Sequence, residues 1–473
     1  MCVEASICIL IGHVRASDFS DLRGPYCEKR SGGCCPGRMD ECSVPILGTL
    51  CYCDEFCNRT RSDDCCPDYW TFCKGFPVPS PAPEPTRRCY HGGRYYNFGE
   101  EIKMNCNKCK CDSVSSFTIE FLCEQNICLV EPGVISAVNS NRELGWSATN
   151  YSMFWGKTLD EGITYKTGTL LPHRTVKRMM PVKVKSKGKL PNSFDARNKW
   201  PGWISGPADQ GWCGASWAVS TASVASDRYA IMSKGLTKVD LSPQHLLSCN
   251  KGQRGCQGGH LSRAWTFIRK FGLVDDYCYP WTGTPTKCKI PKRPNFDALS
   301  SICPPSLGSN LRSELYRVGP AYKIQDEKDI MEEIMQSGPV QATMKVYQDF
   351  FSYKSGVYTK SNTERESSNF GYHSVKILGW GEETNIYGQP IKYWLAANSW
   401  GQQWGENGFF KIRRGTNECE IEEFVLAAWA ETNDPSREII TKFQQAFMQG
   451  QPLYVNKIND TLYFDRSGSR HHG

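Results

Sequence analysis

The segment that decides the fold runs from Gln210 to Trp217 and reads Gln-Gly-Trp-Cys-Gly-Ala-Ser-Trp. The residues after it, Ala218 to Ser233, are mostly small or apolar and predict a helix with Ser216 close to its N-terminus. A second block, Tyr372 to Gly381 (YHSVKILGWG), is strand-like, and a third, Ala397 to Gly401 (ANSWG), follows it. A glutamine, a residue at a helix start, a histidine and an asparagine thus stand in that order over nearly 190 residues.

These blocks, together with Leu190 to Arg197 (LPNSFDAR), resemble the papain family and come nearest to its cathepsin B branch. The resemblance covers about 240 residues and depends on four separate motifs. It implies an α+β fold for residues 190–431, the papain-like two-subdomain fold with a helical left half and a β-barrel-like right half. In the family, the cleft of this fold cuts amide bonds.

The same resemblance assigns a role to each residue of the set. Ser216 stands at the nucleophile position. His373 is the base, Asn398 orients its ring, and Gln210 would donate to the oxyanion. The set is physically reasonable, because a helix N-terminus stabilises an anion and an imidazole can take the proton of the nucleophile.

The family has cysteine at the nucleophile position, whereas this chain has Ser216. A thiol beside a histidine can ionise with a pKa of about 3–4, but a serine hydroxyl is far too weak an acid for such an ion pair. A misplacement of about 1 Å can cost around 100-fold in rate. We therefore expect a pseudoprotease, in which Gln210, His373 and Asn398 are retained because they hydrogen-bond one another. The alternative is an active peptidase that uses Ser216.

Further cleft residues and disulfides follow from the resemblance alone. Trp400 shields the asparagine, Trp217 lines the cleft, and the backbones of Gly258 and Gly259 would contact a peptide. The implied disulfides are Cys213–Cys256, Cys249–Cys288 and Cys278–Cys303. Cys419 is then the odd cysteine. Cathepsin B carries a histidine pair in an occluding loop, but residues 277–308 contain no histidine, so we expect no carboxydipeptidase activity.

Cysteine is concentrated toward the N-terminus, where sixteen of the 25 cysteines lie between Cys27 and Cys128. Such density indicates disulfides and an oxidising compartment. Residues 24–75 hold ten cysteines and resemble a somatomedin-B module, with a zinc site as the alternative. Residues 76–87 are a Pro-rich spacer, and residues 88–131 resemble a von Willebrand factor C or EGF module. Hydrophobic residues make up 40% of the chain, which excludes global disorder.

The N-terminus is expected to carry a secretion signal, residues 1–16, around the apolar run from Ala5 to Gly12. An ordinary buried strand is the alternative. Three Asn-X-Ser/Thr sequons fit a secreted glycoprotein and stand at Asn58, Asn150 and Asn459. No apolar run approaches the roughly 20 residues that a membrane helix needs, so we expect no membrane span.

Residues 132–189 look like a basic, propeptide-like linker and contain no cysteine. Between His173 and Phe194 there are seven Lys or Arg residues and no acid. We interpret this stretch as a flexible solvated linker, and the alternative is a strip at residues 174–189 that binds a heparan-type polyanion. Residues 432–473 form a C-terminal tail without a recognisable motif.

Over nearly its whole length the chain resembles the tubulointerstitial nephritis antigen family. The resemblance implies a secreted, inactive glycoprotein of basement membrane and extracellular matrix that acts in binding and adhesion. It implies laminin, type IV collagen and integrins as partners, with a secreted signalling ligand as a further candidate. A regulator of active cathepsins is an alternative. We expect no cofactor, no metal and no nucleic-acid partner.

Overall fold

The computed structural model divides the chain into two compact units. The first comprises residues 1–140 and 150–159, and the second comprises residues 141–149 and 160–473. The described residues are 19, 22, 24–57, 64–76, 88–114, 118–186, 188–291, 299–304, 311–361 and 369–432, with the backbone of strands at 454–458 and 461–464. The predicted signal peptide 1–16, Asn58, Asn459 and nearly all of the spacer 76–87 lie outside them.

The first cysteine-rich module is built on one hairpin and a set of crosslinks. Its strands β1 (Ser43–Ile46) and β2 (Thr49–Tyr52) are antiparallel, and a π-helical turn, η2 (Tyr69–Cys73), follows. Five disulfides join its ten cysteines: Cys27–Cys53, Cys34–Cys73, Cys35–Cys42, Cys51–Cys66 and Cys57–Cys65. Every sulfur of the module is therefore oxidised, which excludes the zinc alternative.

The second cysteine-rich module consists of two small antiparallel sheets. One pairs β3 (Arg88–His91) with β4 (Arg94–Asn97), and the other contains β5 (Glu101–Met104), β6 (Asn107–Ser113) and β7 (Ile119–Cys123). Its disulfides are Cys89–Cys111, Cys106–Cys128 and Cys109–Cys123. The helix α2 (Pro132–Ser140) follows and buries Ile135 and Val138.

A nine-stranded sheet organises the second unit. Its spatial order is β13 (Tyr322–Ile324), β19 (Val425–Ala427), β14 (Val340–Val346), β16 (Gly371–Thr384), β17 (Pro390–Ala397), β18 (Phe409–Arg413), β15 (Tyr353–Tyr358) and β8 (Trp146–Ala148). The short β10 (Phe194–Asp195) pairs with β16 off this path. Only the β15–β18 pair is parallel among these described strands. The long β16 lies in the middle of the sheet and carries His373.

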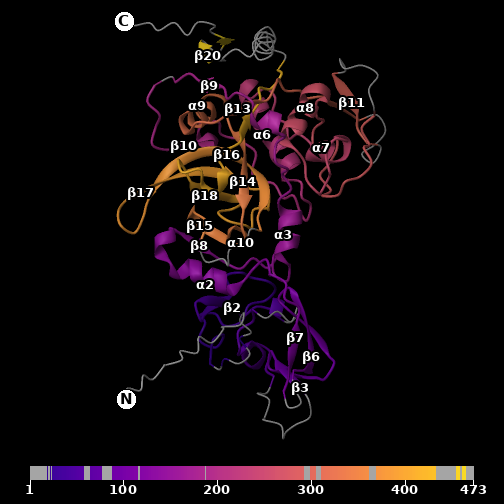
Figure 1. Cartoon of the computed structure of the whole chain (residues 1–473), viewed down its shortest axis with the longest axis vertical. Coiled ribbons are helices and arrows are strands. Elements are labelled where there is room, and N and C mark those ends of the chain that lie inside the picture. Colours follow the sequence, from indigo (N-terminus) through magenta and orange to yellow (C-terminus); the bar gives the residue numbers. More distant parts are fainter. Residues whose placement is uncertain are drawn as a thin grey trace, which may run out of the picture. The chain divides into compact units, whose positions relative to one another are not determined.

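Three helices pack together beside this sheet, as Figure 1 shows for α6 (Ser216–Met232), α7 (Pro243–Cys249) and α8 (Leu261–Phe271). In α6, 15 of 17 residues are buried, because its small and apolar residues lie on every side. The helices share a core that includes Trp217, Leu246, Trp265 and Phe424. The remaining elements are α5 (Ala196–Lys199), α9 (Glu327–Ser337), α10 (Gln348–Phe351), η5 (Glu418–Glu420) and the hairpin β11 (Ser300–Ile302) with β12 (Arg312–Glu314).

A buried ion pair ties α6 to the sheet. Lys376 Nζ on β16 lies 2.6 Å from Asp227 Oδ2 on α6, and both side chains are almost fully enclosed. Burial raises the pKa of Asp227, while the Lys376 ammonium lowers it. Ser205 adds hydrogen bonds to the same carboxylate from its backbone and its hydroxyl. The charge of Asp227 is therefore compensated within the protein rather than by water.

Most of the propeptide-like segment, residues 141–149 and 160–189, belongs to the second unit, whereas residues 132–140 and 150–159 belong to the first. It forms η3 (Arg142–Leu144), β8, α3 (Leu159–Lys166), α4 (Arg174–Lys177) and β9 (Lys183–Val184). Val182 donates its backbone N–H to Lys323 O, and Val184 donates to Asp329 Oδ1 on α9. The interpretation of residues 173–194 as a flexible solvated linker is therefore wrong, because backbone hydrogen bonds and the burial of Val182 and Val184 hold this stretch.

The C-terminal tail contributes a hairpin made of β20 (Tyr454–Ile458) and β21 (Thr461–Phe464). The first of these strands runs parallel to β9, with Tyr454 opposite Lys183 and Val455 opposite Val184. The two segments that flank the papain-like domain in the sequence thus pair with each other. No sequence motif indicated this pairing.

Candidate active site

Ser216 is the first residue of α6, and its side chain is fully buried. Its Oγ lies 2.9 Å from Thr169 Oγ1 and accepts a hydrogen bond of 3.4 Å from the backbone nitrogen of Ser374. The backbone N–H of Ser216 donates to Thr167 O at 3.3 Å, and so satisfies one of the free donors of the helix start. The groups that would meet a substrate are therefore occupied by the chain itself.

The occupant is the segment of residues 165–171, which we call the strap. Thr169 donates its backbone N–H to Tyr372 O at 2.9 Å, and Leu170 donates to Gly259 O at 2.9 Å. Gly259 in turn donates to Gly168 O at 3.0 Å. Both backbone groups of Gly259 that were predicted to contact a peptide are thus used by the strap.

Glycine is required on both sides of this contact because the backbones approach closely. Gly168 has a φ of +109°, and a Cβ there would lie 2.0 Å from Gly214 O. A Cβ on Gly259 would lie 2.5 Å from the Trp217 ring, and one on Gly258 would lie 3.0 Å from Gly168 O. A side chain at Gly168 or Gly259 would therefore force the strap or the cleft wall to move.

His373 pairs with Asn398 but not with Ser216. Its Nε2 lies 2.7 Å from Asn398 Oδ1, and this acceptor requires the proton on Nε2 and leaves the lone pair on Nδ1. Among the described residues, Nδ1 has no hydrogen-bond partner. Burial lowers the pKa of His373 to about 4, the bond to Asn398 opposes this shift, and the Lys166 charge adds to it. The imidazole is therefore neutral near pH 7.

The predicted shield and oxyanion donor are both in place and engaged. The Trp400 ring centroid lies 5.3 Å from that of His373, and its indole nitrogen donates to Lys166 O at 2.6 Å. Gln210 Nε2 donates to Cys213 O at 2.8 Å, to Thr167 O at 3.2 Å and to Tyr165 O at 3.3 Å. Two of those three acceptors belong to the strap, so the amide that would stabilise an oxyanion already binds strap carbonyls.

A ring of hydroxyl groups, which the sequence reasoning missed, surrounds Ser216. Thr169 Oγ1 donates to Ser374 Oγ at 2.9 Å, Ser374 Oγ lies 2.9 Å from Ser220 Oγ, and Ser220 Oγ donates to Ser216 O at 2.7 Å. Since Thr169 has one proton and gives it to Ser374, Ser216 is the donor in its own bond to Thr169. The Ser216 proton therefore points to the strap rather than to His373. The only sign of this hydroxyl ring in the sequence is that Ser374 directly follows His373.

The disulfides implied for the cleft domain are formed in the structure. Their S–S distances are 1.96 Å for Cys213–Cys256, 2.03 Å for Cys249–Cys288 and 2.01 Å for Cys278–Cys303. Trp217, beside the nucleophile position, is fully buried and donates to Gly255 O at 3.1 Å. Cys419 is a half-buried free thiol, and burial followed by the Glu418 charge raises its pKa well above the ordinary value.

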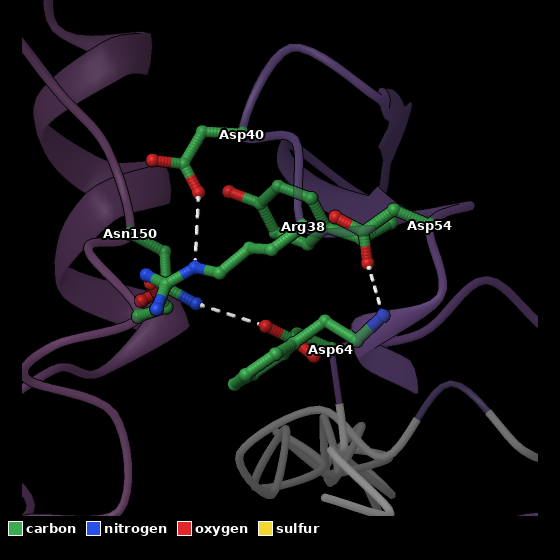
Figure 2. A pocket seen from close by; sticks show the side chains of 8 residues that line it. Arg38, Asp40, Asp54, Asp64 and Asn150 are labelled. Atoms are coloured by element: carbon green, nitrogen blue, oxygen red, sulfur yellow. Dashed lines mark hydrogen bonds and ion pairs between the residues drawn. The ribbon is translucent and has the colours of Figure 1, made fainter. Parts of the chain in front are cut away.

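Asn150, one of the predicted glycosylation sites, lines a small pocket of the first unit (Figure 2). Its Nδ2, the atom to which a glycan would be attached, lies 3.5 Å from Asp64 Oδ2. In the same pocket the Arg38 Nε lies 3.8 Å from Asp40 Oδ1, and Asp54 accepts from the backbone of Phe56. Asn150 is partly buried, and its bond to Asp64 competes with attachment of a glycan to Nδ2 in the folded protein.

The assembled site can hold a backbone but has no complete proton relay. The sequence-predicted Ser216, His373, Asn398, Gln210 and Trp400 meet in one place. General-base attack requires a hydrogen bond from the nucleophile to the base, and here the hydroxyl is bonded to Thr169 instead.

Comparisons with known proteins agree with this architecture. The family described as "Papain family cysteine protease" matches residues 190–429. Mouse (Mus musculus) tubulointerstitial nephritis antigen-like is 48% identical over 435 residues, which covers 88% of this chain and 90% of that protein. Human (Homo sapiens) tubulointerstitial nephritis antigen is 43% identical over 429 residues, which covers 87% of this chain and 88% of that protein.

Among solved structures, the chain resembles procathepsin B S9 from Trypanosoma congolense. The TM-score is 0.53 at 34% identity, and the match covers 64% of this chain and 99% of that chain. The predicted papain-like fold class is confirmed. Within the part of the chain that the structure describes, no helix combines the length and apolar character needed to cross a membrane.

Proposed function

The chain belongs to the papain family and to the tubulointerstitial nephritis antigen family, and we propose from this premise that it is a proteolytically inactive binding protein. Its proposed setting is outside the cell, in the extracellular matrix or basement membrane. The disulfides of its two N-terminal modules support that setting, because such bridges persist in oxidising compartments.

One observation carries the proposed inactivity. The Ser216 hydroxyl is hydrogen-bonded to Thr169 of the strap, and the neutral His373 has no bond to it. A serine in this site needs a base at the moment of attack, since it cannot ionise in advance as a thiol does. Oxygen at the nucleophile position and the strap across the cleft therefore block catalysis independently.

The strap also determines where ligands bind. It uses the backbone of Gly259 and the side chain of Gln210, which a peptide in the cleft would need. We therefore assign binding and adhesion to outer surfaces of the protein rather than to the cleft.

The test is hydrolysis of broad dipeptidyl and tripeptidyl fluorogenic substrates by the full chain. Wild type and Ser216→Ala should both give no turnover. Ser216→Cys alone should also give none, because the strap still covers the thiol. In the double variant Ser216→Cys with Gly168→Ala, the added Cβ would clash with Gly214 O, so the strap should be displaced and turnover should appear.

Turnover by the wild type that is lost in Ser216→Ala would overturn the proposal. A second readout is retention on immobilised laminin and type IV collagen, the partners implied by the family resemblance. Wild type and Ser216→Ala should be retained equally, because the proposed binding does not use the site. Loss of retention in Ser216→Ala would contradict the assignment of binding to outer surfaces.

A further inference from the structure

We propose that the second unit binds a sulfated polysaccharide at a surface where two acid-free basic segments meet beside α8. The inference deepens the proposed matrix function and depends on it in one respect, namely that the protein works outside the cell. It names the class of ligand and the residues, neither of which follows from the cleft.

The two segments are far apart in the sequence and share one property. Residues 162–194 and residues 250–274 contain no Asp or Glu. The second segment carries five cations: Lys251, Arg254, Arg263, Arg269 and Lys270. Each segment alone would present only scattered solvated cations. A continuous basic surface requires both segments to lie side by side.

The strap brings the two segments together. Thr169 forms a β-bridge with Gly259, and Leu170 donates its backbone N–H to Gly259 O, directly before His260. The ring of His173, just beyond the strap, lies 5.6 Å from the ring of His260. Arg174, the first residue of α4, directly follows His173 in the chain.

Positively charged side chains surround His260, and no described acid is among the charges that act on it. Burial lowers the pKa of His260, and the nearby charges of Arg263, His173 and Arg254 lower it further. Arg254 and Arg263 are exposed, and the Arg263 guanidinium is held by the backbone carbonyl of Gly252. Among the described residues, no ion pair involves Arg174, Lys251, Arg254, Arg263, Arg269 or Lys270.

This surface differs from the strip at residues 174–189 that the sequence suggested. In that strip, Lys177 is paired with Glu423 at 3.4 Å, and Lys183 is paired with Asp329 at 3.2 Å and with Asp326. Their charge is therefore largely neutralised within the protein. By contrast, among the described residues none of the five cations on α8 and in the loop before it has an ion pair, so we place the polyanion there.

The shape of the surface favours a linear ligand. Arg263 and Lys270 lie two turns apart on α8, about 10 Å along one face of the helix. Lys251 and Arg254 lie in the preceding loop, where the Arg263 guanidinium donates to Gly252 O. Nucleic acid is excluded by the oxidising setting that the disulfides indicate. Among extracellular polyanions, a sulfated polysaccharide carries anions at high density along an extended chain.

The test compares three charge-matched variants of the full chain on immobilised heparin at increasing NaCl. Arg254→Gln/Arg263→Gln removes two cations of the proposed surface. Lys185→Gln/Lys189→Gln removes two from the linker strip, and Lys328→Gln/Lys354→Gln removes two exposed cations from α9 and β15. All the replaced side chains are solvent-exposed or partly so, so unchanged thermal unfolding is the check on folding.

We expect Arg254→Gln/Arg263→Gln to bind heparin about tenfold more weakly near physiological salt. The affinity of this variant should also fall less steeply as the NaCl concentration rises. The other two variants should change affinity by less than about twofold. Equal losses in all three would show a response to net charge alone and would overturn the site. Equal binding to unsulfated heparosan, or an equal loss on phosphatidylserine vesicles, would overturn the assignment to a sulfated polysaccharide. Neither outcome affects peptide turnover, which tests the proposed inactivity separately.

Discussion

The two units of the chain are stabilised in different ways. The described residues of the first unit contain eight disulfides, and the core of its first module consists largely of the bridged cysteines themselves. The second contains three disulfides, yet it also has a nine-stranded sheet, an enclosed central helix and ion pairs buried between them. Short segments cannot bury enough apolar surface to fold alone, so crosslinks replace the core there. Removing the disulfides should therefore affect the first unit far more, and disrupting the buried ion pairs should affect the second unit far more.

Chemical reduction should produce the largest difference in stability between the two units. Each disulfide contributes typically about 2–4 kcal/mol, and the first unit has little else to stabilise it. With dithiothreitol, limited trypsin digestion followed by mass spectrometry should show cuts throughout residues 24–131 while residues 190–432 stay protected. Simultaneous loss of protection in both units would contradict this division.

Breaking the buried ion pair should destabilise the second unit far more than the first. Lys376→Met leaves the Asp227 carboxylate buried without its cation, which should cost about 3–5 kcal/mol in the free energy of unfolding. The double variant Lys376→Met/Asp227→Leu removes both charges and should recover most of the loss. Urea unfolding followed by tryptophan fluorescence measures both. If the double variant stayed as unstable as the single one, packing rather than charge would be the cause.

The buried His373 should make the second unit sensitive to acid. Its pKa is about 4 in the folded protein and about 6.5 when unfolded, so below pH 6.5 the unfolded state binds more protons and stability falls. The loss between pH 7 and pH 5 should be about 2 kcal/mol. Urea unfolding of His373→Gln at the two pH values should show this component removed, whereas His173→Gln, at an exposed position, should keep it. An unchanged pH dependence in His373→Gln would show that His373 is not buried as described.

The smallest expected effect concerns the first unit. Asn150 Nδ2 is bonded to Asp64 in a small pocket, so Asn150→Gln should not change the electrophoretic mobility of the protein expressed in eukaryotic cells. Treatment with an N-glycosidase before electrophoresis gives the mobility of the unglycosylated chain, with which each sequon variant is compared. A mobility increase in Asn150→Gln would mean that the glycan is attached before this pocket closes.

Much of the cleft could be predicted because its motifs are local. Helix initiation at Ser216 follows from the small and apolar residues after it, and His373 and Asn398 stand in recognisable strand and turn segments. Thr169 and Ser374 could not be found in this way. A hydroxyl side chain has no sequence signature of its own, and the roles of these two depend on the path of the strap.

The linker shows the same limit on a larger scale. Its lack of acids predicts solvation, yet Val182 and Val184 are buried and Lys183 finds carboxylates on α9. The acids that compensate the linker lie more than 140 residues away in the sequence. Local charge counting cannot detect such partners, nor can it detect that the cations before and on α8 have none among the residues that the structure describes.

The sequence alone determined the papain-like fold, the disulfide-rich modules and the presence of oxygen where the family has sulfur, because these depend on residue identity and short-range pattern. Only the tertiary structure decided that the cleft is filled by the chain itself, that the serine proton points away from the histidine, and which cations stay uncompensated. These properties arise from contacts between segments distant in the sequence, where backbone approach and charge pairing depend on how the chain folds back on itself.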